Sequence, residues 1–497
     1  MSEEEQKPKE KQADESKEKK RKLLGIEPVE TRHELTLKDR SIKYMARAGV
    51  IPLKDELGET EAEIFFTAYD LDGIEDRSAR PLVFVFNGGP GSSSIWLHMG
   101  ALGPKRVRMQ PEGWMPVPPY RLEANPYTWL NGADLVFIDP VGTGFSRAAK
   151  AELDQTFWSF RGDIESVGEF IRLYLTRYQR WSSPLFLAGE SYGTTRAAGL
   201  AGHLVERGIT FNGIILISTA LNLRPIFFEQ GDDLPFQLFV PTYAATAWYH
   251  QKLGAELQQR SLPDLMAEVE AWSESELTVA LMKGDRLGEV ERRAVAETLS
   301  AYTGLDLDYV LGTNLRIDIF RFCKELLRGD KRSVGRLDSR FKGVEALAVT
   351  ERPEFDPSML AITPPYTAMF NDYVRSELGI ETDLTYEVLS RKVNETWAWE
   401  KGSLPTTGEA LRGAMARNPF MKVFVGQGYY DLATPHFATA YMINHMNIDP
   451  DLCSNVAMAT YEAGHMFYLD VASLAAFKAD VDEFIEASTP GGKVTQN

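Results

Sequence analysis

The sequence predicts an α/β fold with a mostly parallel central sheet, flanking helices and a largely helical cap insertion. Four short, almost wholly apolar stretches carry Gly, Pro, Asn or Asp at or close to their ends: residues 82–86, 135–138, 185–188 and 214–218. Stretches that are apolar on both faces suit parallel strands that are covered by helices. Segments with helical spacing separate the stretches, and this alternation is typical of a parallel sheet.

The chain before these strands has two parts. Residues 1–22 hold seven acidic and eight basic residues and no aromatic residue, so we expect residues 1–25 to form a disordered charged tail. From about Thr31 the pattern changes to strand, and residues 41–53 and 62–69 are expected to add antiparallel strands to the sheet.

Helices and two late strands complete the expected sheet domain. Residues 157–180 and 194–207 carry apolar positions at helical spacing and follow the second and third apolar stretches. Residues 421–425 and 456–461 are strand candidates near the end of the chain. The sheet therefore continues long after the first group of strands.

The segment between the early and late strands is rich in helical, charged patterns. The simplest organisation is one α/β domain, residues 26–224 and 411–497, interrupted by a helical cap over residues 225–410. This division also accounts for the length of 497 residues, because single hydrophobic cores usually stop growing at about 250–300 residues.

Composition and charge exclude several classes of protein. A content of 44% hydrophobic and 25% charged residues is not that of a fibrous or wholly disordered chain. The net charge is −17, from 54 basic and 71 acidic residues. Such a surface repels phosphate backbones and anionic lipids, so we expect no nucleic-acid partner and no membrane binding.

Cysteine content and the first residues favour a reducing compartment. Cys323 and Cys453 are too few for a disulfide framework and are expected as reduced thiols. Residues 1–22 lack the apolar stretch of a signal peptide, so we expect a cytoplasmic protein. A true N-terminus that differs from this one would instead allow secretion.

The strongest chemical signal is Gly189-Glu190-Ser191-Tyr192-Gly193, which lies between a strand candidate and a helix candidate. A serine on a sharp strand-to-helix turn exposes its hydroxyl, and the flanking glycines permit the crowded backbone. The adjacent helix N-terminus favours developing negative charge. We therefore expect Ser191 to be a nucleophile.

A nucleophilic serine needs a base and a group that orients the base. On a strand–turn–helix scaffold of this kind the chain order is Ser, then Asp or Glu, then His. Asp431 and His465 each follow one of the two late strand candidates, which makes them the preferred partners of Ser191. Packing or surface roles are expected for the other histidines after the serine: His203, His250, His436 and His445.

Acyl transfer also needs hydrogen-bond donors for an oxyanion. One donor is expected to be the backbone N–H of Tyr192, directly after the nucleophile. The other is expected from the loop of residues 87–94, Asn-Gly-Gly-Pro-Gly-Ser-Ser-Ser, which follows the first apolar stretch. This loop lacks the G-K-[ST] ending of a phosphate-binding loop and does not fit G-x-G-x-x-G.

These motifs together identify a resemblance to the serine carboxypeptidases of the α/β-hydrolase fold. Four blocks carry it in the order of the family: residues 87–94, residues 139–146 (Asp-Pro-Val-Gly-Thr-Gly-Phe-Ser), residues 189–193 and residues 464–466 (Gly-His-Met). The resemblance covers roughly residues 40–225 and 415–480 and implies a helical cap after the strand at 214–218. It also implies specific roles: Ser191 as nucleophile, His465 as base, Asp431 as its orienting acid, and the N–H groups of Gly89 and Tyr192 as the oxyanion hole.

The resemblance also implies how a peptide would be recognised. In the family, an Asn, a Trp two residues before it and two glutamic acids hold the C-terminal carboxylate. Asn87 and Glu190 match two of these positions, whereas Val85 replaces the Trp and Ala101 replaces the other Glu. We expect Glu190 and Asn87 alone to recognise the free C-terminus, and activity to be less restricted to acidic pH. Ser92 also replaces a cysteine that is usual in the family.

Three functions remain open on this basis. The first is a serine-type carboxypeptidase that acts on peptides with a free C-terminus through an acyl-enzyme on Ser191. The second is a related esterase or acyltransferase, because the acceptor in the second step does not depend on the triad. The third is an inactive binding protein on the same fold. We expect no cofactor and no metal, and the oligomeric state cannot be inferred from the sequence.

Overall fold

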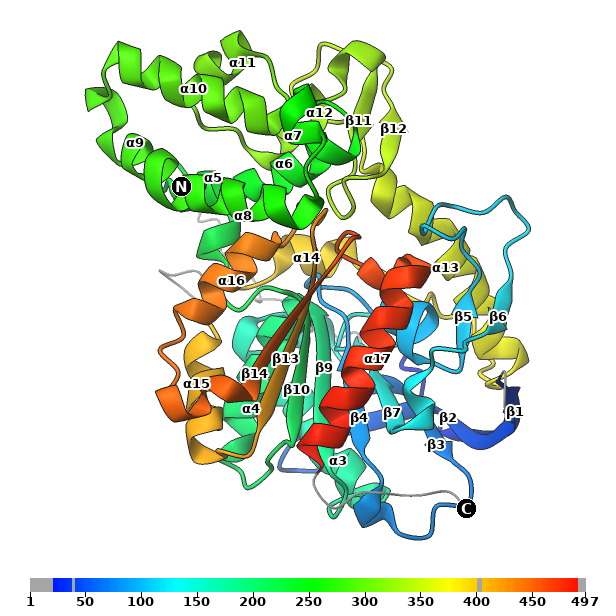
Figure 1. Cartoon of the computed structure of the whole chain (residues 1–497). Coiled ribbons are helices and arrows are strands. Elements are labelled where there is room, and N and C mark those ends of the chain that lie inside the picture. The colour runs from blue at the N-terminus through cyan, green and yellow to red at the C-terminus, as the bar shows by residue number, and fades with distance from the viewer. Residues whose placement is uncertain (1–20, 38–40, 400–404, 490–497) are drawn as a thin grey trace, which may run out of the picture.

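The computed structural model of the chain describes residues 21–37, 41–399 and 405–489. A central sheet has helices on both faces, and a group of helices lies above one end of its strands (Figure 1). The two cysteines are free, Cys323 buried and Cys453 exposed. No helix in the described ranges is long and apolar enough to cross a membrane.

The described residues form a main sheet of ten strands in the order β1-β2-β3-β7-β4-β9-β10-β13-β14, with β8 paired to β3. Its strands are β1 (Val29–Thr36), β2 (Ser41–Lys54), β3 (Thr60–Leu71), β4 (Leu82–Phe86), β7 (Asp134–Ile138), β8 (Arg147–Ala148), β9 (Leu185–Ser191), β10 (Gly213–Thr219), β13 (Lys422–Gly428) and β14 (Val456–Tyr461). All neighbours from β7 to β14 are parallel, whereas β1, β2 and β3 are antiparallel. The predicted α/β fold with a mostly parallel sheet is confirmed.

The strands are apolar throughout because both faces of the sheet are buried. Along β10, Ile214 and Leu216 join the hydrophobic cluster under α3 (Phe160–Arg177) and α4 (Tyr192–Val205). Ile215 and Ile217 point to the opposite face and join the cluster under α17 (Val471–Ser488). Successive side chains of a strand alternate between faces, so a strand between two helical layers needs apolar residues at every position.

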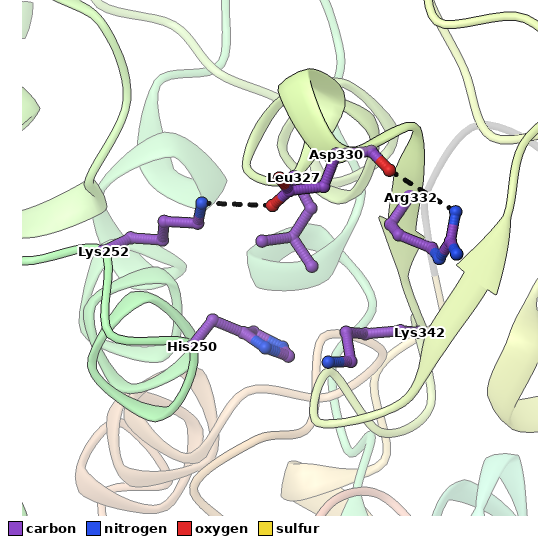
Figure 2. Close-up of a pocket in the computed structure, with 6 residues that line it drawn as sticks. All are labelled: His250, Lys252, Leu327, Asp330, Arg332 and Lys342. Atoms are coloured by element: carbon purple, nitrogen blue, oxygen red, sulfur yellow. Dashed lines mark hydrogen bonds and ion pairs between the residues drawn. The ribbon is translucent and has the colours of Figure 1, made fainter.

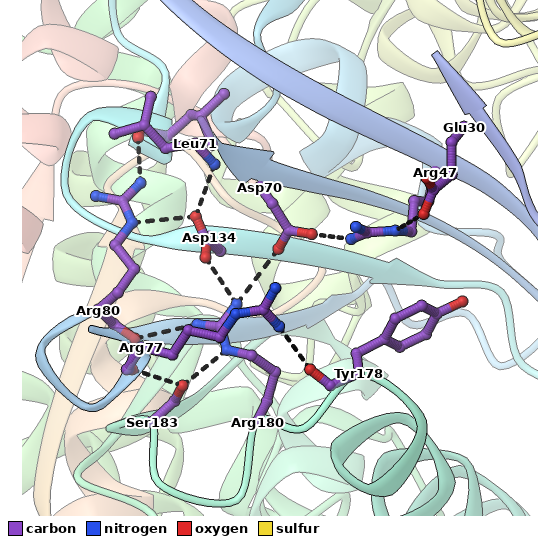
Figure 3. Close-up of polar contacts among 11 residues, drawn as sticks. Glu30, Arg47, Asp70, Leu71, Arg77, Arg80, Asp134, Tyr178, Arg180 and Ser183 are labelled. Atoms are coloured by element: carbon purple, nitrogen blue, oxygen red, sulfur yellow. Dashed lines mark hydrogen bonds and ion pairs between the residues drawn. The ribbon is translucent and has the colours of Figure 1, made fainter. Parts of the chain in front are cut away.

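The amino ends of the parallel strands are tied together by buried ion pairs (Figure 3). The Asp134 carboxylate, at the start of β7, accepts hydrogen bonds from Arg80 Nε at 3.0 Å and from Arg180 Nη1 at 2.7 Å. It also accepts from the backbone N–H of Leu71 in β3 at 3.0 Å. Charges buried this deeply are tolerated because each is paired and hydrogen-bonded. The network lies at the end of the sheet opposite to the loops that follow β4, β9, β13 and β14.

Most helices of the insertion pack on one another above the sheet (Figure 1). They are α5 (Leu234–Leu238), α6 (Val240–Tyr249), α7 (Ala255–Gln258), α8 (Leu262–Trp272), α9 (Thr278–Lys283), α10 (Glu289–Thr303), α11 (Leu307–Gly312) and α12 (Ile319–Glu325). Their cluster of buried apolar residues is separate from the two clusters of the sheet, but it includes Tyr430 and Leu432 from the loop after β13.

The rest of the insertion returns to the sheet. It contains the hairpin of β11 (Arg332–Val334) and β12 (Lys342–Val344), the long helix α13 (Pro357–Ser376) and the short helix α14 (Arg391–Thr396). Ile362, Tyr366 and Phe370 of α13 are part of the same cluster as α17. The domain boundaries that we expected from the sequence stay predictions.

The start of the described chain lies against the sheet domain. The backbone N–H of Arg21 donates to Ala149 O at 2.9 Å, and its side chain pairs with Asp154. The N–H of Gly25 donates to Glu63 Oε2 at 3.0 Å. Residues 21–25 are thus in contact with the fold, whereas the remainder of the predicted tail, residues 1–20, falls outside the described residues.

Candidate active site

Ser191 lies at the junction of a strand and a helix. It is the last residue of β9, and α4 begins at the next residue. Its φ is +60°, a strained value for a residue other than glycine. The turn is crowded, since a Cβ at Gly189 would lie 2.2 Å from Gly193 O, and one at Gly193 would lie 2.9 Å from Phe86 O. The two glycines of the motif are therefore required by close backbone contacts.

Asp431 and His465 meet at the carboxyl edge of the sheet. Asp431 follows β13 and His465 follows β14, and because these strands are parallel their following loops lie side by side. His465 Nδ1 and Asp431 Oδ2 are 2.7 Å apart. The Asp431 carboxylate also accepts from the N–H groups of Ala433 at 2.7 Å and Thr434 at 3.0 Å, and from Thr434 Oγ1 at 2.7 Å.

This arrangement fixes the state of the imidazole. Because the Asp431 carboxylate only accepts, His465 donates its Nδ1–H and keeps Nε2 free as a base. Burial alone would lower the pKa of His465, but the neighbouring Asp431 carboxylate outweighs burial and raises the pKa above its ordinary value. His465 is therefore oriented by Asp431 and stabilised when it carries a proton.

Ser191 and His465 line the same cavity, which has a volume of about 670 Å³. No hydrogen bond joins Ser191 Oγ to His465 among the described residues. Nucleophile-to-base hydrogen bonds are often long in structures without substrate and shorten when it binds. The structure thus brings the three predicted triad residues to one site, two of them in direct contact.

The predicted oxyanion donors also converge on this cavity. The loop after β4 touches the turn after β9 so closely that a Cβ at Gly88 would lie 2.4 Å from the backbone N of Tyr192. Tyr192 is the first residue of α4, so its N–H has no partner within the helix. The Gly89 N–H has no acceptor in the described part of the chain, and both residues line the cavity. Two free backbone donors therefore adjoin Ser191.

Glu190 and Asn87 lie in the cavity wall beside the nucleophile. Glu190 is buried, and burial raises the pKa of its carboxyl group to about 7. Tyr468 donates its hydroxyl to Glu190 Oε2 at 2.5 Å. The buried Asn87 Nδ2 lies near Glu190 and Tyr468 but makes no hydrogen bond of standard geometry to a described residue, while Asn87 Oδ1 accepts from Leu97 N at 3.1 Å. Glu190 and Asn87 can therefore both offer hydrogen-bond donors to a ligand at neutral pH or below.

Val85 and Ala101, the two departures from the resembling family, are buried in the hydrophobic cluster on one face of the sheet. Neither lines the cavity. Tyr468, which contacts Glu190, was not identified from the sequence, and no motif marks it apart from its place three residues after His465.

Comparison with known proteins shows to which protein family the chain belongs. The sequence pattern described as "Serine carboxypeptidase" matches residues 46–467. The chain belongs to the serine carboxypeptidase family. The predicted resemblance is thereby confirmed for most of the chain.

Individual relatives match over shorter segments. Serine carboxypeptidase-like 5 of Arabidopsis thaliana is 30% identical over 153 residues, which cover 29% of this chain and 33% of the relative. The pheromone-processing carboxypeptidase KEX1 of Saccharomyces cerevisiae (strain ATCC 204508 / S288c) is 32% identical over 158 residues, which cover 29% of this chain and 20% of the relative. The matched segments thus span a third or less of the length of these curated relatives.

Among solved structures, the prohormone-processing carboxypeptidase Kex1(delta)p from Saccharomyces cerevisiae aligns with a TM-score of 0.54. The alignment covers 88% of this chain and 91% of that chain at 17% identity. At this identity the match supports the fold, an α/β hydrolase, and nothing finer.

A segment of the insertion holds the two late loops of this serine carboxypeptidase family member in place. The carbonyl of Leu337 accepts from His465 N at 2.6 Å, and Asp338 Oδ2 accepts from Gly464 N at 3.2 Å. The carbonyl of Arg336 accepts from Leu432 N at 3.0 Å, directly after Asp431. We call residues 336–340 the clamp segment. It was not identified from the sequence, because it lies in a stretch without a motif.

None of the other histidines that follow Ser191 lines the cavity that contains Ser191 and His465. His203 is in α4, His436 Nε2 lies 3.0 Å from Glu270 Oε1, and His445 stacks on Tyr441. His250 Nε2 donates to Ser339 O at 2.7 Å and borders a second cavity of about 300 Å³ (Figure 2). That cavity contains none of the predicted site residues, and its other lining residues are Lys252, Leu327, Asp330, Arg332 and Lys342.

Proposed function

We propose that the chain is a serine-type carboxypeptidase that hydrolyses the C-terminal peptide bond of peptides through an acyl-enzyme on Ser191. The observation that carries this proposal is the 2.7 Å hydrogen bond between Asp431 and His465 at the wall of the cavity that also contains Ser191. Membership of the serine carboxypeptidase family supports a peptide as the substrate.

The residues suit a two-step mechanism. His465 Nε2 takes the proton of Ser191 Oγ as the oxygen attacks the scissile carbonyl carbon, and the carbonyl oxygen becomes an oxyanion held by the N–H groups of Gly89 and Tyr192. The tetrahedral intermediate collapses, the C–N bond breaks, and His465 gives its proton to the leaving amine. Water then attacks the ester by the same route in reverse, while Asp431 stabilises the imidazolium in both steps.

Glu190 and Asn87 are the proposed recognition groups for the free C-terminus. With a pKa of about 7, Glu190 is neutral in mildly acidic solution and can donate its proton in a hydrogen bond to a substrate carboxylate. The Asn87 Nδ2 group supplies a second donor. An ionised Glu190 would instead repel the carboxylate, so recognition depends on the protonated form.

We expect the Glu190→Gln variant to lose the alkaline limb of the pH profile. In the native protein, kcat/KM on free peptides should rise as His465 loses its proton, at a pH above its ordinary pKa, and fall again as Glu190 ionises near pH 7. Glutamine keeps a donor but does not ionise, so the fall near pH 7 should disappear. The measurement is kcat/KM of a blocked dipeptide from pH 4 to pH 9.

A neutral ester without a free carboxylate provides the matched control. Its hydrolysis should lack the limb near pH 7 in both proteins, because no substrate charge faces Glu190. An alkaline fall near pH 7 that persists in Glu190→Gln on the free dipeptide would contradict the role of Glu190.

Peptides with free and amidated C-termini test the proposed function itself. After incubation with the protein, mass spectrometry should show loss of one C-terminal residue from the free peptide and much slower loss from its amide. Equal hydrolysis of both would refute an exopeptidase that recognises the C-terminal carboxylate. The cytoplasmic location and the expected absence of nucleic-acid and membrane partners stay predictions.

A further inference from the structure

Arg336, the first residue of the clamp segment, lines the cavity that contains Ser191 and His465. Its guanidinium has no ion pair and no hydrogen bond to any residue in the described ranges. The other arginine of the cavity wall, Arg391, is different, because its side chain is 88% exposed and its Nε lies 2.6 Å from Glu395 Oε1. Arg336 is therefore the cation of this wall that lacks a carboxylate partner among the described residues.

The backbone of Arg336 is anchored on both sides. Its N–H donates to Asp356 Oδ1 at 3.2 Å, and its carbonyl accepts from Leu432 N at 3.0 Å. The next residue, Leu337, donates to Ser358 Oγ at 3.2 Å and accepts from His465 N at 2.6 Å. The Arg336 side chain thus belongs to a backbone that is held beside the catalytic base, so no backbone ordering is needed when it binds a ligand.

Asp356 accepts from the backbone N–H of Arg336, but no carboxylate among the described residues forms an ion pair with its guanidinium. Glu190, with a pKa of about 7, is neutral in mildly acidic solution, and Asp431 is already engaged with His465. The positive charge of Arg336 is near enough to act on the imidazole, and it opposes the rise in the pKa of His465. Two apolar residues of α13, Met359 and Ile362, line the same cavity. A cation in such a partly apolar site gains most from a carboxylate, which can bind a guanidinium through two hydrogen bonds.

We infer that Arg336 binds the side-chain carboxylate of the C-terminal residue, so that the preferred substrates are peptides that end in Asp or Glu. This inference rests on the proposed carboxypeptidase function. It assigns the terminal α-carboxylate to Asn87 and Glu190 and the acidic side chain to Arg336. We assign Arg336 to the C-terminal residue, which leaves as the amine, because of its place in the chain. The next residue, Leu337, accepts a hydrogen bond from the backbone of His465, and His465 protonates the leaving amine.

Blocked dipeptides that end in Glu, Gln and Leu test this inference. Gln has the shape of Glu without its charge, so the ratio of kcat/KM for Glu over Gln isolates the ionic contact. We expect the native protein to favour Glu by about 10- to 100-fold, mainly through a lower KM, as for a hydrogen bond between charged groups. Arg336→Met should bring this ratio close to 1 while activity on the Leu peptide remains.

Arg332→Met is the matched control, because it removes a cation only four residues away. The Arg332 side chain bonds backbone carbonyls of Asp330 and Lys331 and borders the second cavity (Figure 2). We expect this variant to keep the native ratio. A dipeptide with Glu before the scissile bond, compared with Gln there, should show no preference that depends on Arg336.

Several outcomes would overturn the inference. Equal rates on Glu and Gln in the native protein would do so, as would a loss in Arg336→Met that is equal for all three peptides, which would assign Arg336 to the α-carboxylate. If Arg336→Met does not fold, the Glu-over-Gln ratio of kcat/KM is measured for the native protein at rising salt concentration. Salt weakens an ionic contact, so this ratio should fall, and an unchanged ratio would refute the inference. A native protein that cleaves none of the three peptides would refute the proposed function instead.

Discussion

The Ser191→Ala variant is expected to lose kcat by about 10⁵- to 10⁶-fold, the cost of removing a triad nucleophile in other serine hydrolases. The reason is geometric as well as chemical. Ser191 is held at φ +60° directly before α4, and it lines the same cavity as His465. The check is the rate of release of the C-terminal residue by purified variant and native protein.

A fluorophosphonate probe gives an independent measurement of the same site. The native protein should be labelled covalently and Ser191→Ala should not. Ser218 is a suitable control for the substitution, since its hydroxyl donates to His465 O at 2.6 Å but it lies within a different strand, β10. Labelling that survives in Ser191→Ala would contradict Ser191 as the nucleophile. Native protein that is never labelled would favour the binding-protein alternative.

The Asp431→Asn variant is expected to lower kcat by about 10⁴-fold. An asparagine that donates towards His465 Nδ1 would favour the tautomer with the proton on Nε2, and the imidazole could then no longer accept the serine proton. The loss of the carboxylate also removes the charge that raises the pKa of His465. The acid limb of the kcat/KM profile should therefore move to lower pH in the residual activity.

Thr434→Ala is the matched variant for this prediction. It removes one hydrogen bond to Asp431 Oδ2 but leaves the carboxylate and its two backbone donors in place. A loss of about 10-fold is expected for such a contact. If Asp431→Asn cost no more than Thr434→Ala, the orienting role of Asp431 would be wrong.

The sheet and the triad could be predicted because their signals are local. The strand at Leu82–Phe86 was predicted at the bounds that the structure has, since it is apolar on both faces and ends at a Gly-rich loop. The serine motif predicted the strand-to-helix turn, because close backbone contacts require its two glycines. Asp431 and His465 followed from the rule that the carboxyl ends of parallel strands share one edge of the sheet.

The remaining features depend on contacts between distant parts of the chain. Nothing near Tyr468 in the sequence indicates that it donates to Glu190, 278 residues away. Helix α13 has the two prolines Pro364 and Pro365 inside it, a pattern that argues against a helix, yet its apolar face is buried with the sheet. The Tyr468–Glu190 contact and helix α13 both depend on burial in the tertiary structure, which the spacing of residue types along the sequence does not predict.

The clamp segment limits how the insertion can be exchanged between members of the family. Residues 336–340 belong to the insertion by sequence, but they hold the loops of Asp431 and His465. The contacts of Arg336 and Leu337 are backbone hydrogen bonds that do not depend on their side chains, whereas Asp338 contributes its carboxylate. The insertion is therefore not a module that can be exchanged freely between relatives to alter selectivity. A hybrid that takes its upper helices from another member must retain this short stretch in register, whereas single side chains along it, such as Arg336, remain free to vary.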